Sequence, residues 1–205
     1  MQNRFGGFKS NFKYQIVEGF QNNKKCCFIL FVVALIGILT GVFTAINYCN
    51  GETLINFNDF SLCKYLSGEL GTLELFFSRF FSYAIILAIV LITSFSVFVV
   101  PINFFLLAYR GYLLSLNVSI MIILYGIGGI MTGLFIILPC QLLSLVLIAV
   151  FMCISNEKAF TKKKYGVCKE KILGKLLIIL ILLTLINIIE TFLLYIFSSK
   201  VILVI

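Results

Sequence analysis

The amino-acid sequence predicts an all-α fold, a polytopic membrane helical bundle with five transmembrane helices. Of its 205 residues, 61% are hydrophobic and only 12% are charged, and residues 80–156 contain a single formal charge, Arg110. A bilayer core is about 30 Å thick and takes about 20 apolar residues per helical span. That stretch is therefore long enough for three spans. Its segments are apolar on every side instead of alternating, which favours helices over barrel strands.

We expect residues 1–205 to form a single membrane domain. The first apolar segment exceeds the length of a usual signal-peptide core, and no A-x-A pattern follows it, so we expect an uncleaved span. The predicted spans are residues 26–48, 80–99, 102–124, 130–155 and 172–198, with an outer loop at 49–79 and a basic inner loop at 156–171.

The distribution of charge predicts the orientation of the chain, whose net charge is +8. Basic residues outnumber acidic ones by four in residues 1–25 and by five in 157–175, whereas acidic residues are in excess by two in 50–79. Positive segments that flank spans are normally cytoplasmic. We therefore expect a cytoplasmic N-terminus and an external C-terminus. Because the positive charge clusters beside spans, we expect membrane lipids as partners and no nucleic acid.

The connections between spans carry helix-breaking residues. Proline is tolerated in the first turn of a helix and disfavours helix just before it, so Pro101 is expected to open the third span. The glycine-rich sequence at 125–129 predicts a tight turn. Pro139 is expected to kink the fourth span because it removes a helix hydrogen bond.

The second half of the predicted outer loop has helical spacing with an aromatic face. Residues 69–81 mix Glu69, Glu74 and Arg79 with leucines and phenylalanines. This pattern is typical of a helix that lies in the membrane interface. A docking surface for an external partner is the alternative.

Small and polar residues follow regular rows within the spans. Small residues at steps of four let helices approach closely. Polar residues at steps of seven, about two helical turns, project from nearly one face. The third span should therefore be central in the bundle. The small rows are Gly37, Gly41 and Ala45 in the first span and Gly111, Ser115 and Ser119 in the third, and the polar row is Asn103, Arg110 and Asn117.

Arg110 lies about 13 Å inside the third span at 1.5 Å per residue. Unaided burial of a charge there costs at least about 2.5 kcal/mol, so a partner is expected. Glu190 is the one acidic residue in another predicted span. The two depths differ, so a bridge through water or an amide fits better than a direct pair. Arg110 is interpreted as a latch between helices, a site for a lipid headgroup or partner helix, or part of a proton or ion pathway.

The sequence argues against an enzyme. It contains no histidine, which excludes H-E-x-x-H metalloproteases and Ser-His-Asp triads. It has no P-loop and no C-x-x-C spacing, and we expect no cofactor and no metal. Of the seven cysteines, only Cys49 and Cys63 are placed to pair on an oxidising face.

The order of several short motifs resembles the stage II sporulation protein M family. A proline between spans 2 and 3, a basic-Gly pair in span 3, a glycine turn and a Leu-Pro-x-Gln kink occur in that order. The residues that carry the resemblance are Asn22-Asn23-Lys24-Lys25, Val100-Pro101, Arg110-Gly111, Gly126-x-Gly128-Gly129 and Leu138-Pro139-Cys140-Gln141.

This resemblance implies a non-enzymatic membrane scaffold of endospore-forming bacteria. Such a scaffold retains peptidoglycan-degrading partners, the stage II D and P proteins, at the septal and engulfing membrane. A small transport component, such as the substrate-binding membrane subunit of a vitamin importer, is the alternative. It requires a polar cavity large enough for a solute. The candidate residues for an intramembrane polar, packing or partner site are Pro101, Asn103, Arg110, Gly111, Asn117, Pro139, Gln141 and Glu190.

Overall fold

The structure is a computed structural model that describes residues 24–49, 64–65, 68–165 and 172–201. Asn22, Asn23 and Cys63 lie outside the described residues, and so does the predicted pairing of Cys63 with Cys49. The elements are, in order, α2 (Lys24–Cys49), α4 (Thr72–Thr93), the 3-10 helix η2 (Val97–Val99), α5 (Val100–Thr132), the π-helix η3 (Gly133–Ile137), α6 (Leu138–Tyr165) and α7 (Ile172–Val201).

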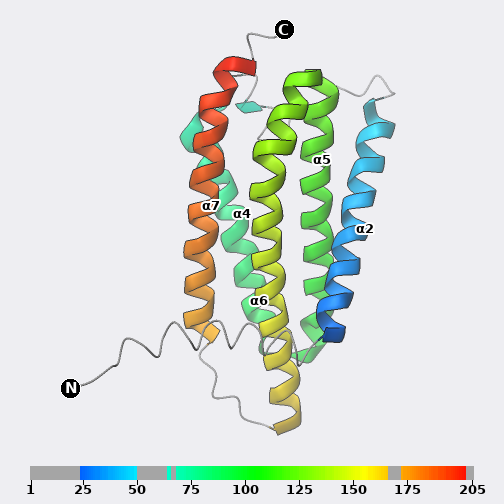
Figure 1. The fold of residues 1–205 in the computed structure, drawn as a ribbon. Helices are drawn as coiled ribbons and strands as arrows, with labels where there is room; N and C mark the ends of the chain where they lie inside the picture. The colour runs from blue at the N-terminus through cyan, green and yellow to red at the C-terminus, as the bar shows by residue number, and fades with distance from the viewer. Residues whose placement is uncertain (1–23, 50–63, 66–67, 166–171, 202–205) are drawn as a thin grey trace, which may run out of the picture.

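Five helical segments of the described chain are long and apolar enough to cross a membrane, which confirms the predicted all-α bundle of five spans. The protein is a multi-pass membrane protein. Figure 1 shows that neighbouring spans in the sequence run in opposite directions, so that the start of α2, the end of α6 and the start of α7 lie at one end of the bundle. We call this end the inner end, following the charge distribution, and its cytoplasmic location stays a prediction.

The second span differs from the prediction. Helix α4 runs over Thr72–Thr93, not 80–99, so the outer loop is shorter than 49–79 and no separate interfacial helix covers 69–81. Glu74 belongs to the first turn of α4, where its carboxylate accepts a hydrogen bond of 3.1 Å from the Gly71 amide. A carboxylate is favourable there because the helix dipole is positive at its N-terminus. Glu74 and Arg79 therefore lie within a span, whereas Glu69 precedes it.

The helix-breaking residues act largely as predicted. Pro101 lies in the first turn of α5. Gly126 has φ 55° and ψ −127°, so the helical backbone is broken inside α5 at this residue. A residue with a Cβ rarely adopts this conformation, so the predicted glycine turn is confirmed. The kink predicted at Pro139 takes the form of the π turn η3 directly before it. The wider turn accommodates the loss of the hydrogen bond that the proline nitrogen cannot donate.

The last two spans are longer than predicted at one end each. Helix α6 continues to Tyr165 instead of ending at 155, so the predicted inner loop 156–171 is helical in its first part. The mixed apolar and charged sequence after 155 is compatible with a helix that projects from the membrane. Helix α7 begins at Ile172, as predicted, and extends to Val201.

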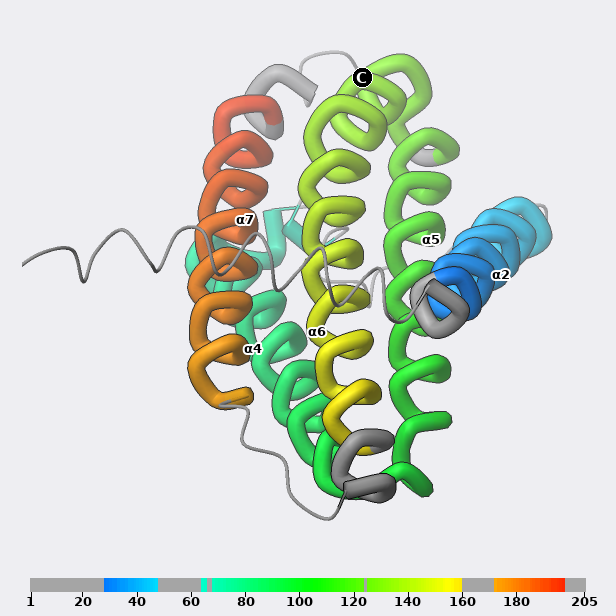
Figure 2. Tube along the Cα trace, turned by 60° about the horizontal axis from the view of Figure 1, so that its bottom comes forward, coloured from blue at the N-terminus to red at the C-terminus, as the bar shows by residue number. Residues whose placement is uncertain are grey.

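The first span packs on the third through glycines. A Cβ on Gly37 would lie 2.1 Å from the Ala108 carbonyl oxygen, and one on Gly111 would lie 2.6 Å from the Ala34 oxygen. The backbones of α2 and α5 are therefore in direct contact, which confirms the predicted close-packing rows. Figure 2 shows α2 against α5 at the edge of the bundle.

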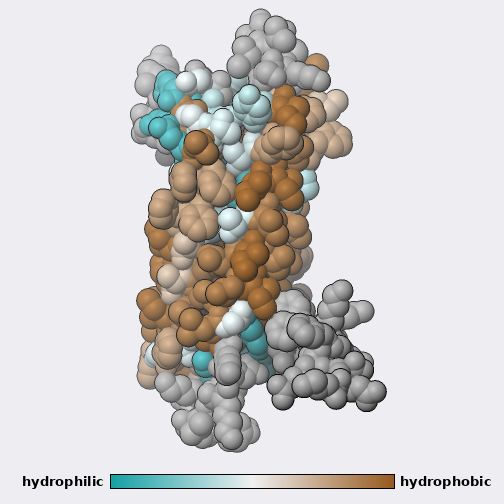
Figure 3. All heavy atoms as spheres, turned by 90° about the vertical axis from the view of Figure 1, so that its left-hand side faces the viewer, coloured by the Kyte–Doolittle hydropathy of each residue, from teal (hydrophilic) through white to brown (hydrophobic). Residues whose placement is uncertain are grey.

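The main core lies between the helices, and the outer surface is apolar. Tyr83, Leu107, Ile148, Phe151 and Leu183 are among its buried side chains. Large apolar side chains such as Phe31, Phe43 and Phe105 are exposed. Figure 3 shows a broad hydrophobic belt across one face, with hydrophilic residues gathered towards its ends. Such a belt is expected on a surface that faces lipid.

A buried polar network joins three helices at the inner end. The Asn103 amide nitrogen donates to Thr93 Oγ1 at 2.8 Å and to Asn156 Oδ1 at 2.6 Å. Ser155 lies 3.0 Å from the same threonine oxygen and donates to the Val90 carbonyl at 2.7 Å. All four polar side chains are buried. The network therefore connects α4, α5 and α6 where the chain turns back after α4.

Asn103→Leu should lower the free energy of unfolding by about 1–2 kcal/mol, because it removes two interhelical hydrogen bonds in a dry environment. Equilibrium unfolding in detergent micelles measures this change. Thr184→Val is the matched control, since within the described part of the chain the Thr184 hydroxyl donates to Leu180 of its own helix and to no other helix. Equal stabilities for the two variants would contradict the assigned role of Asn103.

Candidate functional site

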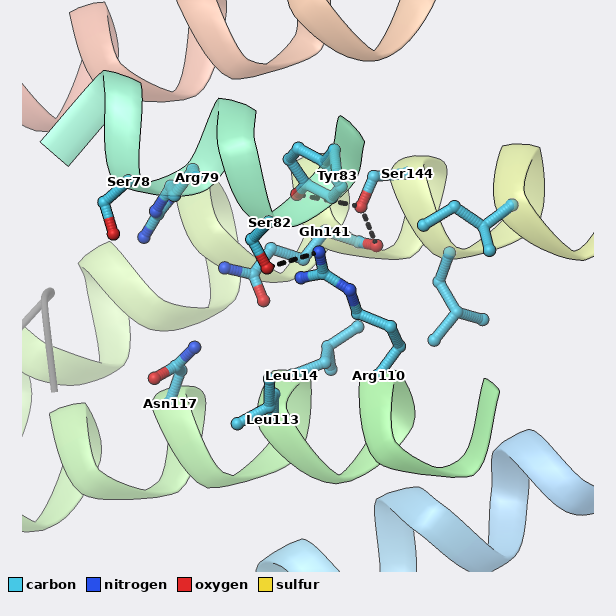
Figure 4. A pocket seen from close by; sticks show the side chains of 12 residues that line it. Ser78, Arg79, Ser82, Tyr83, Arg110, Leu113, Leu114, Asn117, Gln141 and Ser144 are labelled. Carbon is cyan, nitrogen blue, oxygen red and sulfur yellow. Dashed lines mark hydrogen bonds between the residues drawn. The ribbon is translucent and has the colours of Figure 1, made fainter. Parts of the chain in front are cut away.

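Three helices each contribute one face to a polar cavity inside the bundle (Figure 4). Its volume is about 130 Å³. The lining residues recur at steps of three and four along each helix, the spacing of one helical face. They are Ser78, Arg79, Ser82 and Tyr83 of α4; Arg110, Leu113, Leu114 and Asn117 of α5; and Gln141, Ser144, Leu145 and Ile148 of α6.

Arg110 projects into this cavity from α5 and is half-buried. Its Nη2 donates to Ser82 Oγ at 2.9 Å, and its guanidinium carbon lies 4.5 Å from the centre of the Tyr83 ring. An aromatic face stabilises a desolvated cation by about 2 kcal/mol. Its buried Nε has no hydrogen-bond partner among the described residues. The positive charge is therefore held in place but not neutralised.

Glu190 of α7 pairs with Arg79, not with Arg110. Its Oε1 lies 2.5 Å from Arg79 Nη1, and the two side chains are 0% and 10% exposed. The Gln141 amide donates to the same oxygen at 3.3 Å. An amide therefore bonds to Glu190, but it comes from α6 and does not bridge Glu190 to Arg110.

Further polar contacts hold the walls of the site in place. The Tyr83 hydroxyl donates to Ser144 Oγ at 3.3 Å, and Ser144 donates to the Gln141 carbonyl at 2.8 Å. Asn187 of α7 donates to the Phe76 carbonyl of α4 at 3.0 Å. The tyrosine beneath the guanidinium is therefore fixed by α6, and α7 is fixed against α4.

The formal charges around the cavity do not cancel. Arg79 and Glu190 form a neutral pair, whereas Arg110 makes no ion pair with any described residue. Asn117 lines the cavity without a side-chain hydrogen bond to a described residue. The site therefore has one excess positive charge and unused hydrogen-bond donors, which suits an anion.

The structure brings some predicted site residues together and separates others. Arg110, Asn117 and Gln141 line the cavity, and Glu190 touches Gln141 behind it. Asn103 shares the inward face of α5 but belongs to the inner-end network. The remaining candidates shape or pack the helix backbones and do not line the cavity. Pro101 lies at the start of α5, Gly111 in the contact with α2, and Pro139 after the π turn.

Sequence reasoning missed the contribution of α4. Arg79, Ser82 and Tyr83 were placed in a loop or near the start of a span, yet they form one wall of the cavity. The continuous helical spacing of Ser78, Ser82 and Tyr83 around Arg79 is the signal that identifies this wall. Within the described ranges, no three His, Cys, Asp or Glu side chains gather closely enough to hold a metal ion.

No family model matches this chain, and neither does any of the curated proteins or solved structures with which it was compared.

Proposed function

We propose that this protein is a non-enzymatic scaffold of a cell membrane that retains partner proteins. By its resemblance to the stage II sporulation protein M family, the partners are peptidoglycan-degrading proteins of the D and P type, and the site of action is the septal and engulfing membrane. The single observation that supports this proposal is the structural role of the motifs behind the resemblance.

Those motifs correspond to distinct features of the backbone. Pro101 starts α5, Gly111 lies against the Ala34 carbonyl of α2, and Gly126 breaks the helix at the outer end. Pro139 follows the π turn. A set of motifs that shapes a bundle, instead of supplying reactive groups, fits a scaffold better than an enzyme. Arg110 is the exception, because it points into the cavity.

Purification from sporulating cells in mild detergent tests this proposal. The tagged full-length protein should co-purify with wall hydrolases, and its deletion should displace those hydrolases from the septum and stop engulfment. Lys175→Gln, which removes a positive charge from the inner end of α7, is the control for capture through non-specific charge attraction. The hydrolases should co-purify equally with this variant. Normal hydrolase localisation and engulfment in the deletion strain would refute the scaffold proposal.

A small transport component is the second candidate, and the cavity is the observation that favours it. Pockets for drug-sized ligands occupy about 300–1,000 Å³. The cavity measures about 130 Å³, which is too small for a vitamin in this conformation. A transport role is thereby restricted to small anions. Uptake of such an anion that is unchanged by Arg110→Ala would exclude it.

A further inference from the structure

We propose that the cavity between α4, α5 and α6 is a binding site for a phosphate group held by Arg110. This inference does not depend on the scaffold proposal. It rests on the charge, the hydrogen-bonding capacity and the size of the cavity.

The charge of the site selects an anion. Arg79 is already neutralised by Glu190, whereas the Arg110 guanidinium has no counter-charge among the described residues. Arg110 is half-buried, with its Nε fully buried, and the removal of a charge from water is offset by an opposite charge with good geometry. Tyr83 covers one face of the guanidinium at 4.5 Å and does not change its charge. The edge that carries the unpartnered Nε remains for a ligand.

The donors of the site favour an oxyanion over a halide. A guanidinium presents planar N–H groups in a fork that matches two oxygens of a carboxylate or a phosphate. Arg110 retains Nε for such a contact. The Asn117 amide and the Ser78 hydroxyl line the same space from α5 and α4 (Figure 4). Donors on more than one wall suit a tetrahedral phosphate better than a planar carboxylate.

The size and position of the cavity limit the ligand. A volume of about 130 Å³ admits a phosphate group but no large organic solute. Ser78 is exposed and lies on the second turn of α4, near the outer end of the bundle. The phosphate can therefore be free in solution or belong to a phospholipid headgroup at that interface. Both sources present the same chemistry to Arg110.

Binding measurements on the purified full-length protein distinguish these sources. The protein is prepared in a maltoside detergent and a phosphate-free buffer, after removal of bound lipid. One titration uses inorganic phosphate and a second uses phosphatidylglycerol in mixed micelles, each followed by thermal stability and calorimetry. Sodium chloride at equal ionic strength is the control for screening.

We expect saturable binding in at least one titration. Arg110→Gln should weaken it about tenfold to a hundredfold, as expected for the loss of charge-assisted hydrogen bonds. Lys175→Gln, outside the cavity, should leave it unchanged. Asn117→Leu provides a second variant, because it fills the cavity without removing a hydrogen bond made by the described residues. Binding of phosphate alone assigns a free ion, and binding of the lipid with displacement by phosphate assigns a headgroup.

Three results would overturn the assignment. The first is that neither phosphate nor the lipid binds at millimolar concentration. The second is binding that is unaffected by both Arg110→Gln and Asn117→Leu. The third is an equal response to chloride, which would show that the site has no preference for an oxyanion.

Discussion

Glu190→Leu should lower the free energy of unfolding by about 3–5 kcal/mol, the usual effect of removing one partner of a buried ion pair. The carboxylate is fully buried, lies 2.5 Å from Arg79 Nη1 and also accepts a hydrogen bond from Gln141. Its loss leaves the Arg79 guanidinium inside the bundle with no counter-charge from any residue that the structure describes. The remaining charges of the cavity are then Arg79 and Arg110, which repel each other.

Equilibrium unfolding in detergent micelles measures the effect, and a double-mutant cycle isolates the pair. Arg79→Leu combined with Glu190→Leu should recover much of the stability, because apolar replacement of both partners leaves no buried charge. Thr184→Val of the same helix is the control. A double variant as unstable as the sum of both single variants would show that the two side chains are not coupled.

The fold was predictable from sequence where a short local pattern determines the backbone. Apolar runs of sufficient length gave the number of spans, Pro101 marked the start of α5, and the glycines after Tyr125 marked the break at Gly126 inside α5. For the proline and the glycines the physical cause lies within a few residues, either in missing hydrogen bonds or in allowed backbone angles. The predicted rows of small residues also meet across α2 and α5.

The candidate site was predictable only in part, since its polar side chains are paired across helices distant in sequence. Arg79 was assigned to an interfacial segment of the outer loop because charged residues are mixed there with an aromatic face. Its partner Glu190 lies on α7, and no local pattern connects the two. For the same reason Glu190 was considered as a partner of Arg110, whose actual contacts are Ser82 and Tyr83.

Depth along a helix explains why the polar row of α5 does not form one site. Asn103, Arg110 and Asn117 all face inwards, as the spacing of seven predicts. Asn103 meets the end of α4 at Thr93, whereas Arg110 meets the middle of α4 at Ser82. Because α4 and α5 are antiparallel, each step along α5 faces an earlier part of α4. Sequence periodicity gives the face but not the neighbour at each level.

Gly37→Leu should separate α2 from the bundle and lower the free energy of unfolding by about 3 kcal/mol. Overpacking a core costs about 1–3 kcal/mol when flexible side chains can give way. At Gly37 the nearest atom to an added Cβ is the Ala108 backbone oxygen, at 2.1 Å, so the helix itself must move. The effect is therefore expected at the upper end of that range, with loss of the adjoining contact between Gly111 and the Ala34 carbonyl.

Equilibrium unfolding measures the stability, and the distance between spin labels at Leu35 and Phe105 measures the displacement of α2. Both positions are exposed, so that the labels do not disturb the packing. Gly174→Leu is the matched control, because nothing lies within 4 Å of a Cβ added at that glycine of α7. An unchanged label distance together with wild-type stability would show that α2 and α5 are not in backbone contact. We expect glycine at position 37 to be required because the backbone of α5 lies against it, and not because of the conformation of α2 itself.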